Sequence, residues 1–121
     1  MSDPLIRRLF AMSPDVRYVA VYRGGRLESA SRDGLAQASS SESDRYEELI
    51  VNPTLLTLVT QRGNIDCGGA RWVVIRYGNF FETVVPTKDG HVSVGLEPSA
   101  DPVALAEAIL EVVSAEAKEA R

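Results

Sequence analysis

Residues 70 to 97 constrain the fold most, because they have the pattern of three consecutive antiparallel strands. The predicted strands cover residues 70–77, 79–85 and 91–97. The turn signals between them are Gly78-Asn79 and Asp89-Gly90. Pro86 cannot donate to a strand ladder, so we expect it to mark the end of the second strand. A meander of this kind needs helices to cover its apolar faces.

An earlier segment, "VRYVAVYRGGRLESASR", has the pattern of a β-hairpin. Gly24-Gly25 supplies a two-residue turn that tolerates positive φ. Both faces of the first strand are largely apolar, so we expect it to be covered on both sides. The return strand, residues 26–31, is more polar and is predicted to lie at a sheet edge.

Two of the three predicted helices have clear start signals. Asp3 with Pro4, and Asp101 with Pro102, each place an N-cap residue before a proline at the first helical position. The first of these helices is expected to end near Met12, and the last to run toward residue 121. Residues 33–43 between the hairpin and the central helix are small and polar, which predicts a loop.

The central helix, residues 43–63, is apolar over more than half its circumference. Its main apolar stripe comprises Tyr46, Leu49, Ile50, Pro53, Leu56 and Val59, and Val51, Leu55 and Leu58 lie off it. Asp44 and Glu47 have capping-box spacing, and Glu47 and Glu48 are expected to be solvated. The surplus apolar surface predicts a partner.

Pro53 is expected to interrupt the central helix, because proline removes a backbone donor and clashes with the preceding turn. Asn52-Pro53 also suits the start of a helix. The sequence therefore predicts a kinked helix, or two short helices that meet at Asn52. Gly63-Asn64 is predicted to end it in a left-handed stop.

The segments follow the order α-β-β-α-β-β-β-α, with no internal repeat. We predict a single domain over residues 1–121, of the α+β class, with helices on both faces of a central five-stranded antiparallel sheet. A chain of 121 residues buries enough surface to fold without a disulfide or a metal.

Composition excludes several classes of function. The net charge is -4 and the basic residues do not cluster, which argues against nucleic-acid or anionic-membrane binding. A single cysteine permits no internal disulfide, and no signal peptide or membrane span is evident. We expect a cytoplasmic protein.

The order of elements resembles the roadblock/LC7 domain, within the profilin-like and longin-like group. The resemblance covers almost the whole chain. Three segments carry it: "VRYVAVYRGGRLESAS", "YEELIVNPTLLTLVTQ" and "HVSVGLEPSADPVALAEAIL". Pro53, "NIDCGG" and "RYGNFF" depart from the usual pattern and suggest a distinct, uncharacterised branch.

The resemblance implies a non-enzymatic homodimer that acts as a regulator or scaffold through protein contacts. In such dimers the two central helices pack together, and the first strands of the two meanders pair. Here these elements are residues 43–62 and residues 70–77. The family also includes regulators of small Ras-like GTPases, so such a GTPase is the expected further partner. The predicted interface residues are Leu55, Leu58, Val51, Trp72 and Val74.

The residues themselves offer little chemistry. Cys67 is the one thiol and His91 the one imidazole, and a reactive cysteine needs a nearby base or cation. More often such a cysteine is a small residue in a tight connector. The glycine pairs match no phosphate-binding pattern, and the His, Cys and Asp spacing supplies no metal-ligand set. We therefore predict no catalytic, cofactor-binding or metal-binding residue.

Two alternatives remain open. The first is a small-molecule sensing module, for which Ser93 and Gly95 would leave room between the sheet and a helix. The second is a thiol-dependent enzyme that uses Cys67 with His91. A bound ligand or a well-formed pocket favours the first, and an effect of Cys67→Ser on function favours the second.

Overall fold

The computed structural model describes residues 3–119. The elements are α1 (Pro4–Met12), β1 (Val16–Arg23), β2 (Arg26–Ser31), α2 (Ser41–Tyr46), a π-helical turn (Glu47–Val51), α3 (Asn52–Asp66), β3 (Val73–Arg76), β4 (Phe81–Thr87), β5 (Gly90–Leu96) and α4 (Pro102–Glu119). The last residues of the predicted final helix, 120 and 121, lie outside the described residues.

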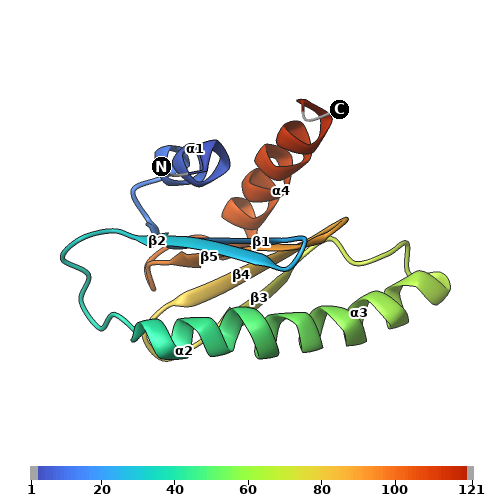
Figure 1. Ribbon diagram of the computed structural model, residues 1–121, viewed down its shortest axis with the longest axis horizontal. Helices are drawn as coiled ribbons and strands as arrows, with labels where there is room; N and C mark the ends of the chain where they lie inside the picture. Colours follow the sequence, from blue (N-terminus) through green and yellow to red (C-terminus); the bar gives the residue numbers. More distant parts are fainter. Residues whose placement is uncertain (1–2, 120–121) are drawn as a thin grey trace.

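A five-stranded antiparallel sheet forms the middle layer, in the order β2-β1-β5-β4-β3. Figure 1 shows α1 and α4 on one face of the sheet and α2 with α3 on the other. The predicted α+β class, element order and three layers are confirmed. Both outer strands, β2 and β3, leave one edge unpaired within the described chain.

The predicted hairpin turn and the predicted N-caps of the first and last helices form as expected. Gly24 and Gly25 have φ of 58° and 80° and close the β1–β2 hairpin. Asp3 caps α1 by accepting from the Leu5 amide at 2.8 Å, and Asp101 caps α4 by accepting from the Ala104 amide at 3.2 Å. No helix within residues 3–119 has both the length and the hydropathy that crossing a bilayer requires.

On the sheet face toward the central helix the buried apolar residues include Ala20, Val84 and Leu56. The main hydrophobic cluster lies on the other face. It is formed by Leu5, Ile6, Leu9, Val16, Val19, Val21, Val85, Val92, Val94, Leu96, Ile109 and Val113. These residues come from α1, α4 and the strands between them, and none of the described residues of the central helix belongs to this cluster. The central helix must therefore be held to the sheet by other contacts.

The central helix changes type at Asn52 without separating into two helices: α3 begins there, directly after the π-helical turn, and the chain stays helical through Pro53. Asn52 has helical φ and ψ of -64° and -45°, and its amide donates to the Glu47 carbonyl, five residues back. The wider π turn accommodates a proline that has no amide to donate. The N-cap is Ser40, which accepts from the Ser43 amide at 3.1 Å, and not Asp44.

The helix also ends later than the glycine signal predicted. It continues to Asp66, and Gly63 is a buried helical residue whose carbonyl accepts from the amides of Cys67 and Gly69. The left-handed conformation falls on Gly68 and Gly69, with φ of 80° and 89°. The stop predicted at Gly63-Asn64 is therefore wrong by one turn, because the Gly68-Gly69 pair ends the helix instead.

Strand boundaries differ from the prediction in the meander. β3 covers only Val73–Arg76 of the predicted 70–77, and β4 continues through Pro86 to Thr87. Pro86 pairs with His91 near the end of β4 rather than ending the strand. A proline is tolerated there because the ladder has almost ended.

Gly90 provides a test of the packing between β5 and β1. A Cβ atom there would lie 2.0 Å from the Tyr22 carbonyl oxygen, which is backbone and cannot move freely. We expect Gly90→Ala to lower the free energy of unfolding by about 1–3 kcal/mol or more. Urea denaturation followed by circular dichroism measures the change.

Gly78→Ala is the matched control, because no atom lies within 4 Å of a Cβ placed there and its φ is not in the left-handed range. We expect that change to stay within about 0.5 kcal/mol. Equal stability of the two variants would contradict the close β5–β1 approach.

Candidate functional site

A layer of polar side chains fills the space between the central helix and the sheet. Its members are Glu48, Asn52, Glu82, His91 and Ser93, which we call the buried polar layer. Each is at most 2% exposed. Glu48 and Asn52 come from the helix, one turn apart, and the other three come from β4 and β5. A polar layer therefore stands where most domains place a second apolar core.

Glu48 is the centre of the hydrogen bonds in this layer. Its Oε2 accepts from Ser93 Oγ at 2.5 Å, and its Oε1 accepts from Asn52 Nδ2 at 3.0 Å. His91 Nε2 lies 2.8 Å from the same Oε1, so we assign its proton to Nε2. Three groups thus satisfy one buried carboxylate, which is the condition for burying it at all.

Glu82 is the second carboxyl group of the layer. Its Oε2 accepts from Asn52 Nδ2 at 3.2 Å, so Asn52 bridges the two carboxyl groups. Burial raises the pKa of Glu82 well above its ordinary value, and the negative charge of Glu48 adds to the effect. Two carboxyl groups this close favour a proton on one of them.

The layer does not have the geometry of a hydrolytic site. In a catalytic triad the imidazole lies between the nucleophile and the acid. Here Ser93 and His91 each hydrogen-bond to Glu48. All three side chains are at most 2% exposed. The arrangement fixes the helix on the sheet instead.

Cys67 and His91 are not brought together as a thiol site requires. His91 is buried against Glu48 and stacks on the Tyr22 ring, with centroids 5.5 Å apart. Cys67 is exposed after α3, where its Sγ lies 3.3 Å from Arg62 Nη1 and 3.4 Å from an Asp66 carboxylate oxygen. Within residues 3–119, no group of three or more His, Cys, Asp or Glu side chains is placed to hold a metal ion.

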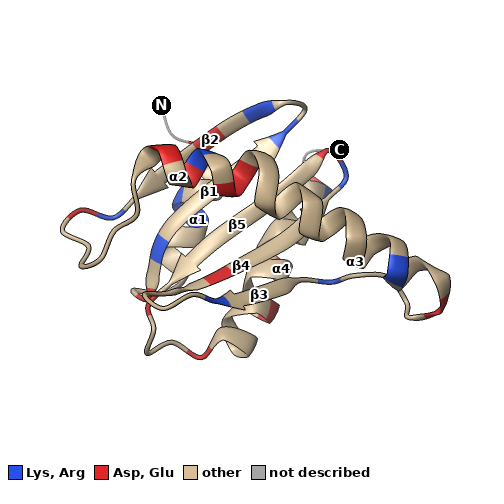
Figure 2. Cartoon of the chain, turned by 90° about the horizontal axis from the view of Figure 1, so that it is seen from below, with Lys and Arg blue, Asp and Glu red and all other residues tan. Residues whose placement is uncertain are grey.

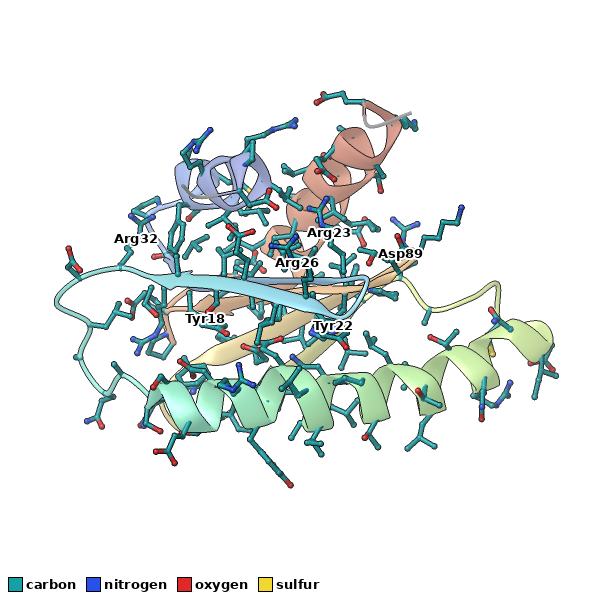
Figure 3. All side chains as sticks on the ribbon, viewed as in Figure 1. Tyr18, Tyr22, Arg23, Arg26, Arg32 and Asp89 are labelled. Carbon is teal, nitrogen blue, oxygen red and sulfur yellow. The ribbon has the colours of Figure 1, made fainter. Side chains whose placement is uncertain are left out.

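A cavity of about 360 Å³ lies beside the polar layer, between the start of the central helix and the end of the sheet near β1. Tyr18, Phe80 and Gly95 form part of its wall, and Glu47, Glu48 and Glu82 contribute carboxyl groups. Figure 3 shows Tyr18 on the helix-facing side of the sheet. Of the two small residues that the sensing-module alternative named, Gly95 lines this cavity, whereas Ser93 does not and donates to Glu48 instead.

Two polar atoms at the cavity have no partner in the described structure. They are Tyr18 Oη and Glu47 Oε2, both shielded from solvent. The other Glu47 oxygen accepts from Tyr77 Oη at 2.8 Å, which ties the turn after β3 to the helix. Burial raises the pKa of Glu47, and burial followed by the charge of Glu48 raises that of Tyr18.

The outer face of the central helix exposes large apolar side chains. They are Tyr46, Leu49, Ile50, Leu58, Val59 and Ile65, which we call the outer apolar face, and they are 36% to 75% exposed. Residues 49–61 contain no charged residue. In Figure 2 this face is turned toward the viewer, and most of α3 is free of red and blue. Such a surface is typical of a protein interface.

The predicted stripe therefore points outward, and polar residues point inward. Of the stripe residues only Leu56 is buried, whereas Glu48, expected to be solvated, is fully buried. Apolar periodicity does not tell which side of a helix meets the sheet when the facing strands carry polar residues. The signal that identifies the inner side is the Glu48-Asn52 spacing together with Glu82, His91 and Ser93 on neighbouring strands.

The structure separates the five predicted interface residues into two groups. On the central helix, Leu58 is 60% exposed, while Val51 and Leu55 are half-buried. On the meander, Trp72 and Val74 are half-buried; Trp72 packs on the core and donates to Glu107 at 2.6 Å. Val74 belongs to β3, whose outer edge has no strand beside it within the described chain.

Comparison with known proteins places this fold among roadblock/LC7 structures. The sequence matches no family profile and no curated protein. A roadblock/LC7 domain from Streptomyces avermitilis is similar with a TM-score of 0.69 and 18% identity, covering 94% of this chain and 92% of that one. The gliding protein MglB from Thermus thermophilus is similar with a TM-score of 0.64 and 10% identity, covering 95% and 87%.

MglC from Myxococcus xanthus is similar with a TM-score of 0.59 and 10% identity, over 97% of this chain and 96% of that one. At these identities the likeness concerns the fold. The chain therefore has the roadblock/LC7 fold, as the order of its elements predicted. One of its structural neighbours is a gliding protein, MglB.

The raised pKa of Glu82 predicts how stability depends on pH. Because the folded state holds this proton more tightly than the unfolded chain, the stabilisation is complete below the unfolded pKa of about 4.3 and is lost as pH rises through the folded pKa. Glu82→Gln keeps an acceptor for Asn52 and removes the titration. We expect the variant to gain stability relative to the parent as pH rises, with a limiting slope of about 1.4 kcal/mol per pH unit.

Urea denaturation between pH 4 and pH 8 measures this difference. Glu111→Gln, at an exposed position of α4, is the matched control and should differ from the parent by no more than about 0.5 kcal/mol. A constant difference between Glu82→Gln and the parent across this range would show that Glu82 titrates alike in both states.

Proposed function

We propose that this protein is a homodimeric docking platform that regulates or scaffolds other proteins and has no catalytic activity of its own. The observation that carries the proposal is the outer apolar face, which is exposed and has no charged residue between positions 49 and 61, although the chain has a hydrophobic core elsewhere. Large apolar side chains exposed side by side are costly in water, and a second copy would cover them. The open edge of β3 lies on the same molecule and adds a site for strand pairing.

A twofold contact explains both features together. In an isologous dimer the same patch meets itself, so one helix face and one strand edge satisfy their counterparts in the partner. The roadblock/LC7 fold supports this choice, since one similar structure is MglB in a tetrameric arrangement, with a TM-score of 0.57 and 10% identity over 89% of this chain and 84% of that one. Self-association of that neighbour motivates the proposal here.

Within the dimer, we assign Leu58 to the helix contact and Val74 to the strand contact. Leu58 is 60% exposed and belongs to the uncharged segment, and Val74 lies on the unpaired strand. Val51, Leu55 and Trp72, half-buried in one copy, would border the contact. A small Ras-like GTPase is the proposed partner of the assembled platform, on the strength of the resemblance.

Leu58→Asp tests the dimer. We expect the parent to be a dimer at micromolar concentration by light scattering coupled to size exclusion, and the variant to dissociate with a Kd raised by roughly tenfold to a hundredfold. A buried carboxylate without a partner opposes association, whereas the monomer tolerates it because the position is exposed.

Val103→Asp is the control, since Val103 is a similarly exposed apolar residue (57%) on α4, across the sheet. It should leave the Kd unchanged. A parent that is monomeric at micromolar concentration, or equal weakening by both variants, would exclude the outer apolar face as the contact.

The proposed GTPase partner is tested by measuring binding to small Ras-like GTPases of the same organism. Each GTPase is prepared with GDP and with a non-hydrolysable GTP analogue, and binding is measured by calorimetry with the parent protein. We expect one of them to bind in one nucleotide state more tightly than in the other. Absence of binding in both nucleotide states would contradict the proposed GTPase partner and would not affect the proposed dimer.

A further inference from the structure

We propose that the cavity beside the buried polar layer binds a small organic cation, an amine or guanidine attached to an aromatic or apolar body. The cavity has a volume of about 360 Å³, within the range of about 300–1,000 Å³ that is usual for small-molecule sites. This inference concerns a ligand and does not depend on the dimer.

The carboxyl groups around the cavity favour a cation over an anion. Four carboxyl groups line it, those of Asp44, Glu47, Glu48 and Glu82. Among the described lining residues Arg17 is the single cation. None of the ion pairs within residues 3–119 joins a lysine or arginine to any of the four. His91 hydrogen-bonds one of them, Glu48, and leaves the others without a counter-charge.

Arg17 does not neutralise the carboxyl groups, because its guanidinium is engaged elsewhere. Nη1 donates to Glu97 Oε1 at 3.2 Å, and Nη2 donates to the Ala36 carbonyl at 2.9 Å. The guanidinium also lies over the Phe80 ring, 5.3 Å from its centroid. Arg17 thus holds the 36–37 loop and β1 together at the cavity rim.

Glu47 is the residue that would bind the cationic group of the ligand. Its Oε2 is shielded from solvent and has no partner, while Oε1 is already held by Tyr77. An ammonium group there would form a charge-assisted hydrogen bond with a carboxylate that the fold has already positioned. Burial raises the pKa of Glu47, and a cation bound beside its free oxygen would favour the ionised form.

The remaining wall suits an apolar body. Tyr18 and Phe80 present aromatic surface, and Gly95 leaves space beside Tyr18, whose hydroxyl also has no partner. Aromatic faces attract organic cations through their quadrupoles. Convergent carboxylate and hydroxyl oxygens beside aromatic rings favour a cation over an anion, which the four carboxyl groups would repel.

Three probes of matched shape test the proposal: tyramine, which is cationic, 4-ethylphenol, which is neutral, and 4-hydroxyphenylacetate, which is anionic. Binding to the full-length protein is measured by calorimetry and by amide chemical shifts. We expect tyramine to bind at least tenfold more tightly than 4-ethylphenol, with shifts centred on Glu47, Phe80 and Gly95, and the anion not to bind. Equal binding of tyramine and 4-ethylphenol, or no binding of tyramine at millimolar concentration, overturns the proposal.

Two variants locate the binding. Glu47→Gln should weaken tyramine binding about tenfold, the effect of losing one charge-assisted hydrogen bond. Glu42→Gln on the same helix, exposed and outside the cavity wall, should leave it unchanged. Gly95→Leu places a side chain in the cavity and should abolish binding; its Cβ would make an ordinary contact with Tyr18 Cβ at 3.4 Å, and circular dichroism checks that the variant is folded. Equal loss in Glu47→Gln and Glu42→Gln, or tyramine binding that persists in both Glu47→Gln and Gly95→Leu, would refute the site.

Discussion

The hydrogen bonds to the Glu48 carboxylate are the interaction on which the packing of the central helix against the sheet depends. Through them one side chain joins the central helix to Ser93 and His91 of β5, and Asn52 extends the contact to Glu82 of β4. Apolar contacts tolerate sliding, whereas directional bonds to a buried charge fix the rotation of a helix about its axis. The polar layer therefore determines which side of the helix faces out.

That rotation explains the exposed apolar surface. Because Glu48 and Asn52 occupy the inner side together with Leu56, several apolar residues of this uncharged segment, Leu49, Ile50 and Leu58 among them, are exposed. A helix with an ordinary apolar inner face would present polar residues to solvent. The interior polar contacts and the exposed apolar residues are thus two results of one arrangement, on which the proposed dimer is based.

The fold could be predicted from the sequence wherever turns and helix caps depend only on residues that are close in the sequence. Gly24-Gly25, Asp3 and Asp101 act through neighbouring residues, and the order of elements follows from them. The site was not accessible, because Glu48, Glu82 and His91 meet only through tertiary contacts. Glu48 has the spacing of a solvated first-turn residue, and Pro53 implied a break that a π-helical turn avoids. Long-range pairing of polar residues overrides the local pattern at Glu48, and a local change of helix type does so at Pro53.

The position of the chain ends has a practical and a biological consequence. α1 begins at Pro4 and α4 ends at Glu119, and both helices lie on the sheet face opposite the central helix, as Figure 1 shows. Arg8 of α1 and Glu119 of α4 form an ion pair at 3.2 Å, which keeps these segments together. A tag, a fluorescent protein or a fused module attached at either end would therefore project from the back of the molecule. Two such appendages on a symmetric pair would point away from each other, on opposite sides of the assembly.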